Sequence, residues 1–295
     1  NSTKTPMAKI VPAKTTVHTR PAPFMAYFSS RGPNVIDPTI LKPDITAPGL
    51  NILAAWSGAN SLTGLEEDTR RVEWNIYSGT SMSCPHVAAA AALLKAVHPT
   101  WSSAAIRSAL ITTAGLKNNN GSMITDSDGN PADPFQFGGG HLQPMKAADP
   151  GLVYDASYTD YLVYLCSLKV KVPEPSFKCP QVVPKTNDLN HPSLSIAKLN
   201  RTITVTRTVT NVGKGGSTYI AHVSPPLGYS VKISPSALVF KHSGQKKRFT
   251  ITVQESQRGS KINNKGKRKE NYEFGWYTWS DGVHTVRSPM VVSSA

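Results

Sequence analysis

The chain has 295 residues, of which 39% are hydrophobic; this is enough for about two domains with buried cores and excludes a chain that is disordered throughout. Its 32 lysines and arginines exceed its 18 aspartates and glutamates, and the formal net charge of +14 admits nucleic acid, an acidic polymer or an anionic surface as a partner. No run of about 18 apolar residues occurs, so we expect no membrane-spanning segment.

The first half of the sequence predicts an α/β layer. Short apolar runs at residues 25–28, 52–56 and 74–77 are separated by Pro and Gly and are typical of strands. A helix is expected over 80–97, with Pro85 in its first turn, where the missing N–H costs little. Because this helix is apolar on nearly every side, we expect it to be buried as the central helix of a parallel sheet.

A second helix and a change of pattern follow. The amphipathic stretch 104–113 predicts a helix with an N-cap near Ser102. After about residue 185 only strand patterns occur, in runs that alternate apolar and polar residues: 194–199, 203–209, 219–223, 229–233, 238–240, 249–253, 274–279 and 283–292. We therefore expect an all-β sandwich over 187–295. Its large core side chains are expected to be Phe240, Phe249, Trp276 and Trp279.

Much of the positive charge lies near the end of the sequence. Residues 241–270 contain ten basic and two acidic side chains, and the stretch 258–269 is polar and contains glycine. No aromatic residue interleaves these charges, which favours a solvated hairpin loop over a nucleic-acid site. A site for an acidic polymer is the alternative.

Three cysteines are too few for a disulfide scaffold and have the wrong spacing for a zinc site. Cys166 and Cys179 lie in a Pro-rich connecting stretch and are predicted to form a disulfide bond. Cys84 then stays free, and its place at the start of an apolar helix predicts a buried side chain.

Three glycosylation sequons are compatible with secretion. They begin at Asn1, Asn120 and Asn200, and the latter two are the expected glycosylation sites. No acidic cluster of the EF-hand type occurs, and we expect neither a metal nor a cofactor.

The segment 79–86, Gly-Thr-Ser-Met-Ser-Cys-Pro-His, places Ser81 at the N-terminus of the apolar helix. A helix start offers unpaired backbone N–H groups and a positive dipole end, which would stabilise an oxyanion on an acyl substrate beside Ser81. Gly79 would let a substrate backbone approach closely. By itself, however, such a segment more often means that Thr80 or Ser81 simply caps the helix.

The complete octapeptide, followed by Val-Ala-Ala-Ala-Ala-Ala, resembles the nucleophile motif of subtilisin-like serine proteases. Four further segments resemble the plant members of that family and occur in the same order: 28–34, 41–49, 99–110 and 279–284. The resemblance implies that Ser81 attacks a peptide carbonyl and that Gly79 and Thr80 bind the substrate. It also implies a fibronectin-III-like sandwich after the catalytic domain. The implied protein is a secreted plant endopeptidase of the apoplast or cell wall that acts on proteins or peptides and binds neither nucleic acid nor membrane.

In the resembled family the catalytic Asp, the catalytic His and the oxyanion-hole Asn precede the nucleophile, and none of their motifs is present here. His18 is the sole histidine before Ser81 and lacks the His-Gly-Thr context, while His86 lies about 140° round the helix axis from Ser81. The segment 126–129 follows the nucleophile and is interpreted as a turn. We therefore expect a C-terminal portion of the protease whose upstream half carries the missing residues, and we expect this chain alone to be inactive.

Four segments are expected along the chain: a connection from an upstream inserted domain (1–24), the C-terminal part of the catalytic domain (25–165), a linker (166–186) and the sandwich (187–295). The alternative function is a non-catalytic binding module for an acidic polysaccharide or a partner protein. A thiol nucleophile at Cys84 is a third hypothesis, which the absence of a positioned base disfavours.

Overall fold

Eight strands form the described residues of the C-terminal part of the chain, each at a run where apolar and polar residues alternate. The computed structural model describes residues 7–9, 11, 14, 16–256 and 272–295. The strands are β4 (Leu194–Leu199), β5 (Thr202–Asn211), β6 (Ser217–Ser224), β7 (Tyr229–Ser234), β8 (Ala237–Phe240), β9 (Lys246–Glu255), β10 (Tyr272–Ser280) and β11 (Thr285–Ser294). All eight predicted runs form strands, and the predicted sandwich is confirmed.

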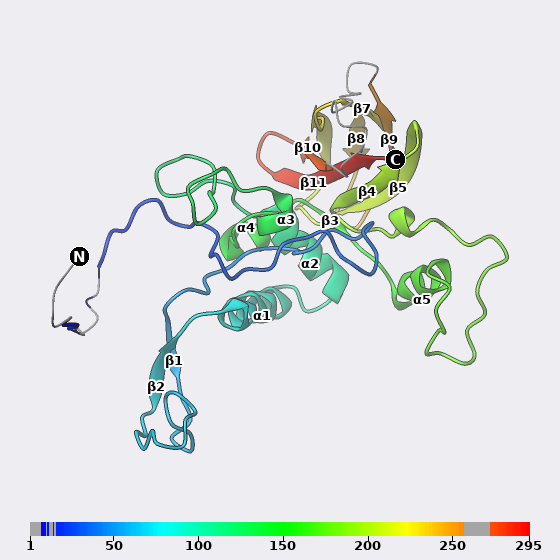
Figure 1. Cartoon of the computed structure of the whole chain (residues 1–295). Helices are drawn as coiled ribbons and strands as arrows, with labels where there is room; N and C mark the ends of the chain where they lie inside the picture. Colours follow the sequence, from blue (N-terminus) through cyan, green and yellow to red (C-terminus); the bar gives the residue numbers. More distant parts are fainter. Residues whose placement is uncertain (1–6, 10, 12–13, 15, 257–271) are drawn as a thin grey trace.

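The strands form two sheets that share one core (Figure 1). One sheet has the order β4-β11-β10-β6-β8, and the other has the order β3-β5-β9-β7, in which β3 is Leu152–Tyr154. Neighbouring strands are antiparallel except β4 and β11. In the core the rings of Trp279 and Phe249 are 5.0 Å apart and edge to face. Such a pair adds about 0.5–1.5 kcal/mol to the gain from burial alone.

The strand β3 comes from the chain well before the segment that was expected to form the sandwich. It pairs with β5, where Leu152 lies opposite Asn211. Leu152 and Tyr154 are completely buried in the sandwich core, and Ser288 Oγ donates a hydrogen bond to Tyr154 Oη (3.3 Å). The sandwich therefore depends on a strand outside residues 187–295.

The two tryptophans of β10 lie on opposite faces of their sheet. Successive strand residues alternate between faces, so positions three apart cannot share one core. Trp279 is completely buried between the sheets, whereas Trp276 stacks on Phe137 outside that core, with ring centroids 6.2 Å apart. The prediction that both fill the sandwich core is wrong for Trp276, which instead packs against the helical part.

The described residues before the sandwich form five α-helices and one 3-10 turn. These are α1 (Thr80–Val97), α2 (Ser103–Thr112), α3 (Pro134–Phe137), α4 (Pro144–Ala147), α5 (Tyr158–Ser167) and the turn Thr186–Asp188. The N-cap Ser102 of α2 accepts a hydrogen bond from the Ala105 N–H (3.0 Å). This buried helix contacts α1, α4, β3 and β11 and so joins the helical part to the sandwich.

The helix α1 lies at the surface, which differs from the expected burial against a parallel sheet. Ala90 and Leu94 are its buried residues, while Leu93 and Val97 are 63% and 62% exposed. Beside it, β1 (Ile52–Ala55) and β2 (Trp74–Tyr77) form an antiparallel hairpin that projects from the body of the chain (Figure 1). In the described part of the chain no third strand pairs with this hairpin, and residues 25–28 form no strand. The helix α1 is exposed because the described residues form no sheet that covers it.

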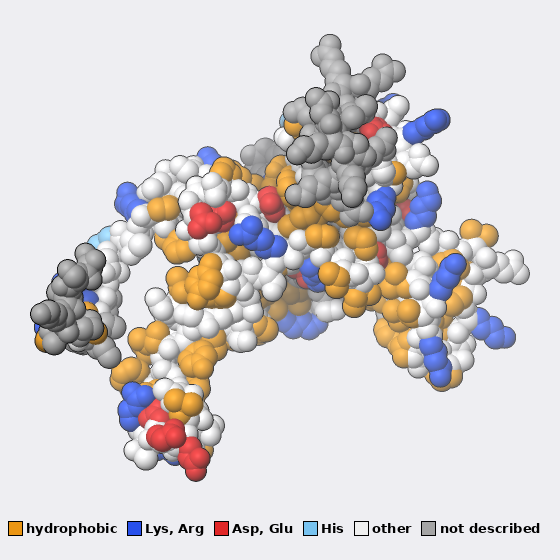
Figure 2. All heavy atoms as spheres, in the orientation of Figure 1, with side chains coloured by type: hydrophobic (Ala, Val, Ile, Leu, Met, Phe, Trp, Pro, Cys, Tyr) orange, Lys and Arg blue, Asp and Glu red, His pale blue; other side chains and the backbone are white. Residues whose placement is uncertain are grey.

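Apolar side chains are therefore exposed on the hairpin. Leu53, Trp74 and Ile76 are 64%, 62% and 55% exposed. Figure 2 shows hydrophobic side chains gathered around the base of the hairpin and the adjoining surface of the helical part. A patch of this kind is uncommon on a protein surface that has no partner.

His284 lies between two carboxylates where the helical part meets the sandwich. Its Nδ1 is 2.8 Å from Asp281 Oδ2, and its Nε2 is 3.2 Å from Asp149 Oδ2. Burial by itself would lower the pKa of His284, but the two carboxylates raise that pKa above its usual value. Burial would raise the pKa of Asp281, but hydrogen bonds from His284 and from backbone N–H groups lower it to about 2. The charged imidazole thus stabilises the folded chain.

Replacing His284 by Asn is expected to change how stability depends on pH. A histidine whose pKa is raised on folding contributes stability that is fully present below its ordinary pKa of 6.5 and is lost as pH rises through the folded pKa. The chain with His284 should therefore have a larger unfolding free energy than His284→Asn at about pH 6. This difference in unfolding free energy should become smaller as the pH rises towards about 9. Denaturant unfolding at a series of pH values measures this. The exposed His222 on β6 provides the control variant His222→Asn, and a difference that is independent of pH would contradict the ion pair.

Replacing Tyr154 by Ala should destabilise the sandwich by about 3–5 kcal/mol, because it removes a fully buried aromatic ring from the core. Tyr158, which is 65% exposed, provides the matched control. Tyr158→Ala should change the unfolding free energy by no more than about 0.5 kcal/mol. Equal effects of the two substitutions in denaturant unfolding would show that β3 is not part of the core.

Candidate active site

Ser81 lies in the first turn of α1, four residues beyond the end of β2. The strand leads through Ser78 and an extended Gly79 into the helix. Ser81 and Thr80 are exposed, and Gly79 is half-buried. The hairpin and the helix therefore present the serine at the surface, as a nucleophile requires.

The turn before Ser81 is attached to the segment 47–49. The Gly79 N–H donates a hydrogen bond to Gly49 O (2.8 Å), and Ser83 Oγ donates one to Ala47 O (3.0 Å). A Cβ on Gly49 would lie 2.2 Å from Ser83 Oγ and 2.8 Å from Gly79 O, so this approach requires glycine. Sequence reasoning assigned no role to Gly49, although the dipeptide Pro48-Gly49 lies in one of the segments that carried the family resemblance.

The start of α1 is an electropositive position. The helix has 18 residues and no acidic side chain in its first turn, so the positive end of its dipole is uncompensated. The N–H groups of Thr80 and Ser81 donate no hydrogen bond to any residue that the structure describes. An oxygen atom that gains negative charge beside Ser81 would be stabilised here.

No base lies against Ser81. Among the described residues, no hydrogen bond or ion pair involves the Ser81 side chain. His86 Nδ1 is 2.8 Å from the backbone oxygen of Met82, one turn earlier in the same helix. The structure thus brings Ser81, Thr80 and Gly79 together without a histidine or a carboxylate.

A serine, a histidine and an aspartate do meet elsewhere, in the interface with the sandwich. His191 Nδ1 is 2.7 Å from Ser193 Oγ, and its Nε2 is 3.6 Å from Asp44 Oδ1. Burial lowers the pKa of His191, and His191 together with Lys42 holds the pKa of the Asp44 carboxyl below its usual range despite burial. Because His191 and Ser193 are only 4% and 5% exposed, a substrate cannot reach them. This cluster is an interdomain contact.

The cysteines take two different positions. The structure joins Cys166, in α5, to Cys179 by a disulfide with a Cα–Cα distance of 5.8 Å, which ties down the loop after α5. Cys84 is free and exposed, so the prediction that it is buried is wrong. The reason is that its side of α1 is not covered by any described residue.

The remaining sequence predictions concern surface segments. Asn120 and Asn200 are both exposed: Asn120 lies in the turn between the bridged residues Lys117 and Met123, and Asn200 lies between β4 and β5. Asn1 and the basic stretch 258–269 lie outside the described residues. The segment 126–129 is a turn in which Asp126 Oδ1 accepts hydrogen bonds from the Asp128 and Asn130 N–H groups (both 2.9 Å).

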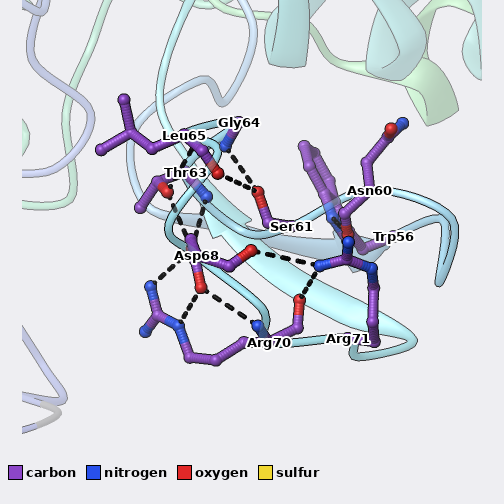
Figure 3. A network of polar contacts seen from close by, with 9 residues as sticks. All are labelled: Trp56, Asn60, Ser61, Thr63, Gly64, Leu65, Asp68, Arg70 and Arg71. Atoms are coloured by element: carbon purple, nitrogen blue, oxygen red, sulfur yellow. Dashed lines mark hydrogen bonds and ion pairs between the residues drawn. The ribbon is translucent and has the colours of Figure 1, made fainter.

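The loop between β1 and β2 folds around one carboxylate. Asp68 Oδ2 accepts hydrogen bonds from Thr63 Oγ1 (2.7 Å) and Arg70 Nη2 (2.9 Å), and these contacts hold the Asp68 pKa below its usual range (Figure 3). Trp56 stacks on Tyr77 at 5.8 Å, beside a cavity of about 420 Å³. A second cavity of about 490 Å³ lies between α5 and β5. Neither is lined by residues 79–81.

Two further findings concern the described residues alone. They contain no group of three or more His, Cys, Asp or Glu side chains that could hold a metal ion. They also contain no helix that is long and apolar enough to cross a membrane.

Residues 13–140 match the subtilase family, and residues 188–292 match a fibronectin type-III domain. The chain is 56% identical over 294 residues to the subtilisin-like protease SBT5.6 of Arabidopsis thaliana, covering 99% of this chain and 37% of that protein. Residues 13–140 of the chain belong to the subtilase family.

Other subtilases are similar over the same extent. The Arabidopsis thaliana protease SBT5.5 is 53% identical over 298 residues, covering 99% of this chain and 36% of that protein. The Glycine max protease Glyma18g48580 is 45% identical over 294 residues, covering 96% of this chain and 36% of that protein. The chain thus spans about 37% of the length of SBT5.6. The expected combination of an α/β subtilase part with a fibronectin-III sandwich, and the resemblance to the plant members, are confirmed.

Alkylation of the native chain should modify Cys84 and no other cysteine. An exposed thiol reacts through its thiolate, whereas Cys166 and Cys179 are oxidised. Treatment with iodoacetamide should add one label, which peptide mass spectrometry locates, and Cys84→Ser should add none. Three labels before reduction, or none, would contradict this assignment.

Proposed function

We propose that Ser81 is the nucleophile of a secreted subtilisin-like serine endopeptidase that acts on protein or peptide substrates. The observation that carries the proposal is an exposed serine at the uncompensated positive end of an 18-residue helix, in a chain 56% identical to a subtilisin-like protease. In the proposed reaction Ser81 Oγ attacks the scissile carbonyl, and the carbonyl oxygen becomes an oxyanion. The free N–H groups at the start of α1 are placed to stabilise that charge.

The proposed reaction also requires a base, because the Ser81 hydroxyl must lose its proton as it attacks. We infer that the catalytic Asp and His and the oxyanion-hole Asn belong to an upstream part of the protease. The extra length of the relatives, of which this chain covers 36–37%, supports this inference. In subtilisin, loss of the His alone lowers turnover by about 2 × 10⁶-fold. The chain alone is therefore proposed to be inactive.

The exposed apolar surface supports the same arrangement. Leu53, Trp74 and Ile76 of the hairpin are more than half exposed, although they carry large apolar side chains. Burial of apolar surface stabilises by about 25 cal/mol per Å², so such a surface favours association. We propose that the upstream half of the same protease covers it.

Secretion to the apoplast or cell wall is part of the proposal. The Cys166–Cys179 disulfide fits an oxidising compartment, and the sequons at Asn120 and Asn200 are exposed to glycosylation enzymes. Protein or peptide substrates are the proposed partners, and we propose no nucleic acid and no membrane among them.

A fluorophosphonate probe tests the nucleophile. In a protein that carries this chain together with the upstream part of the protease, the probe should label Ser81, and Ser81→Ala should abolish labelling. Ser230→Ala, at an exposed serine of β7, is the control and should label normally. The 295-residue chain alone should label more than about a thousandfold more slowly, because it lacks the base. Labelling of another serine would refute the assignment, and fast labelling of the chain alone would refute the missing base.

A further inference from the structure

The sandwich sends one cationic side chain into the helical part. Arg287, in β11, donates hydrogen bonds from Nη2 to the backbone oxygens of Ala114 and Gly139, the latter at 3.2 Å. Its guanidinium carbon lies 5.2 Å from the centre of the Trp276 ring, which stacks in turn on Phe137. Burial lowers the pKa of Arg287 to about 10, so the side chain stays charged at neutral pH.

This arginine has no carboxylate partner among the described residues, and its Nε is buried without a hydrogen bond. Removing the charge of Arg287 from water without an ion-pair partner costs free energy, so other contacts must offset that cost. The contacts that offset this cost are the two carbonyl groups and the aromatic ring. Ala114 follows the C-terminus of α2, where the helix dipole also favours a cation.

The segment that Arg287 holds is bonded directly to the segment behind the nucleophile. The Gly139 N–H donates to Asp44 O (2.9 Å), the Thr46 N–H donates to Gly140 O (2.9 Å), and the Leu142 N–H donates to Thr46 O (2.9 Å). A Cβ on Gly139 would lie 2.5 Å from Ile111 O, so this segment is also pressed against α2. Residues 44–46 and 139–142 thus form one rigid ladder.

The ladder continues without a gap to the nucleophile turn. Residues 47–49 follow it in sequence, and they bond to Gly79 N–H and to Ser83 Oγ on either side of Ser81. Hydrogen bonds and short stretches of backbone therefore connect Arg287 of the sandwich continuously to the nucleophile turn.

We propose that Arg287 is a positioning residue, through which the fibronectin-III sandwich holds the nucleophile turn at Ser81 in place by way of residues 139–142 and 44–49. The positioning role rests on the proposed function of Ser81, whereas the mechanical coupling does not. A turn that is displaced by about 1 Å would lower the rate of attack by Ser81 more than it weakens substrate binding.

Amide hydrogen exchange of the full chain tests the coupling without any activity. Two variants are compared: Arg287→Met removes the charge and the hydrogen bonds, and Arg287→Lys keeps the charge but loses the planar fork. Exchange of the Thr46 and Gly79 amides should become at least about tenfold faster in Arg287→Met and less so in Arg287→Lys. The exposed Arg248 of β9 provides the control Arg248→Met, which should change neither amide. If Arg287→Met does not fold, Arg287→Lys alone supplies the comparison.

Core amides of β5 and β9 report on general destabilisation and should keep their exchange rates within about twofold. Unchanged exchange at Thr46 and Gly79 would overturn the proposal. A rise that is equally large in β5 and β9 would also overturn it, because it would indicate loss of stability throughout.

The catalytic consequence is measured in the protein that also carries the upstream part. Arg287→Met should lower kcat for a peptide substrate, and the rate of fluorophosphonate labelling, by at least about tenfold. The change in KM should be smaller than the change in kcat, and Arg287→Lys should restore part of the loss. If amide exchange is faster in Arg287→Met but the probe does not label Ser81 in the protein without substitutions, the proposed function is refuted and the coupling stands. Normal labelling, with kcat unaffected by Arg287→Met, would overturn the positioning role alone.

Discussion

The backbone hydrogen bonds between residues 44–46 and 139–142 are the contacts on which the arrangement of the chain depends. They hold the segment beneath the nucleophile turn on one side, and they abut the buried helix α2 and the sandwich on the other. The segments approach so closely that a side chain at Gly49 or Gly139 would collide with its neighbours. Because hydrogen bonds of this kind tolerate little displacement, the position of Ser81 is tied to that of the sandwich.

The two parts of the chain are stabilised in different ways. The sandwich encloses its own core, in which aromatic side chains from both sheets interlock, and it takes Leu152 and Tyr154 from the preceding segment to complete it. The helical part has a smaller core around α2, which includes Ala90 and Leu94 of α1 and leaves the outer side of α1 and the β1–β2 hairpin exposed. It contacts the sandwich through polar groups, such as His284 with Asp149 and His191 with Asp44, and through apolar side chains, such as Phe137 with Trp276.

Residue types alone do not identify the catalytic groups in this chain. The serine that is exposed at a helix N-terminus has no base. The serine that contacts His191, which in turn lies beside Asp44, is buried between the two parts of the chain. Exposure and access to a substrate distinguish the two. A nucleophile must reach its substrate, and the interface cluster around His191 cannot.

The sequence by itself determined the features that depend on local pattern. Alternating residues specified the eight strands of the sandwich, the apolar run with Pro85 in its first turn specified α1, and the octapeptide identified Ser81, Gly79 and Thr80 as the candidate site. Tertiary structure alone decided which surfaces meet: that Trp276 faces the helical part, that β3 joins the sandwich, that Cys84 is exposed and that Arg287 reaches Gly139. The physical reason is that periodicity records which side of an element is apolar but not which partner covers that side. A partly buried arginine held by backbone carbonyls leaves no pattern at all, because its acceptors are present in every residue.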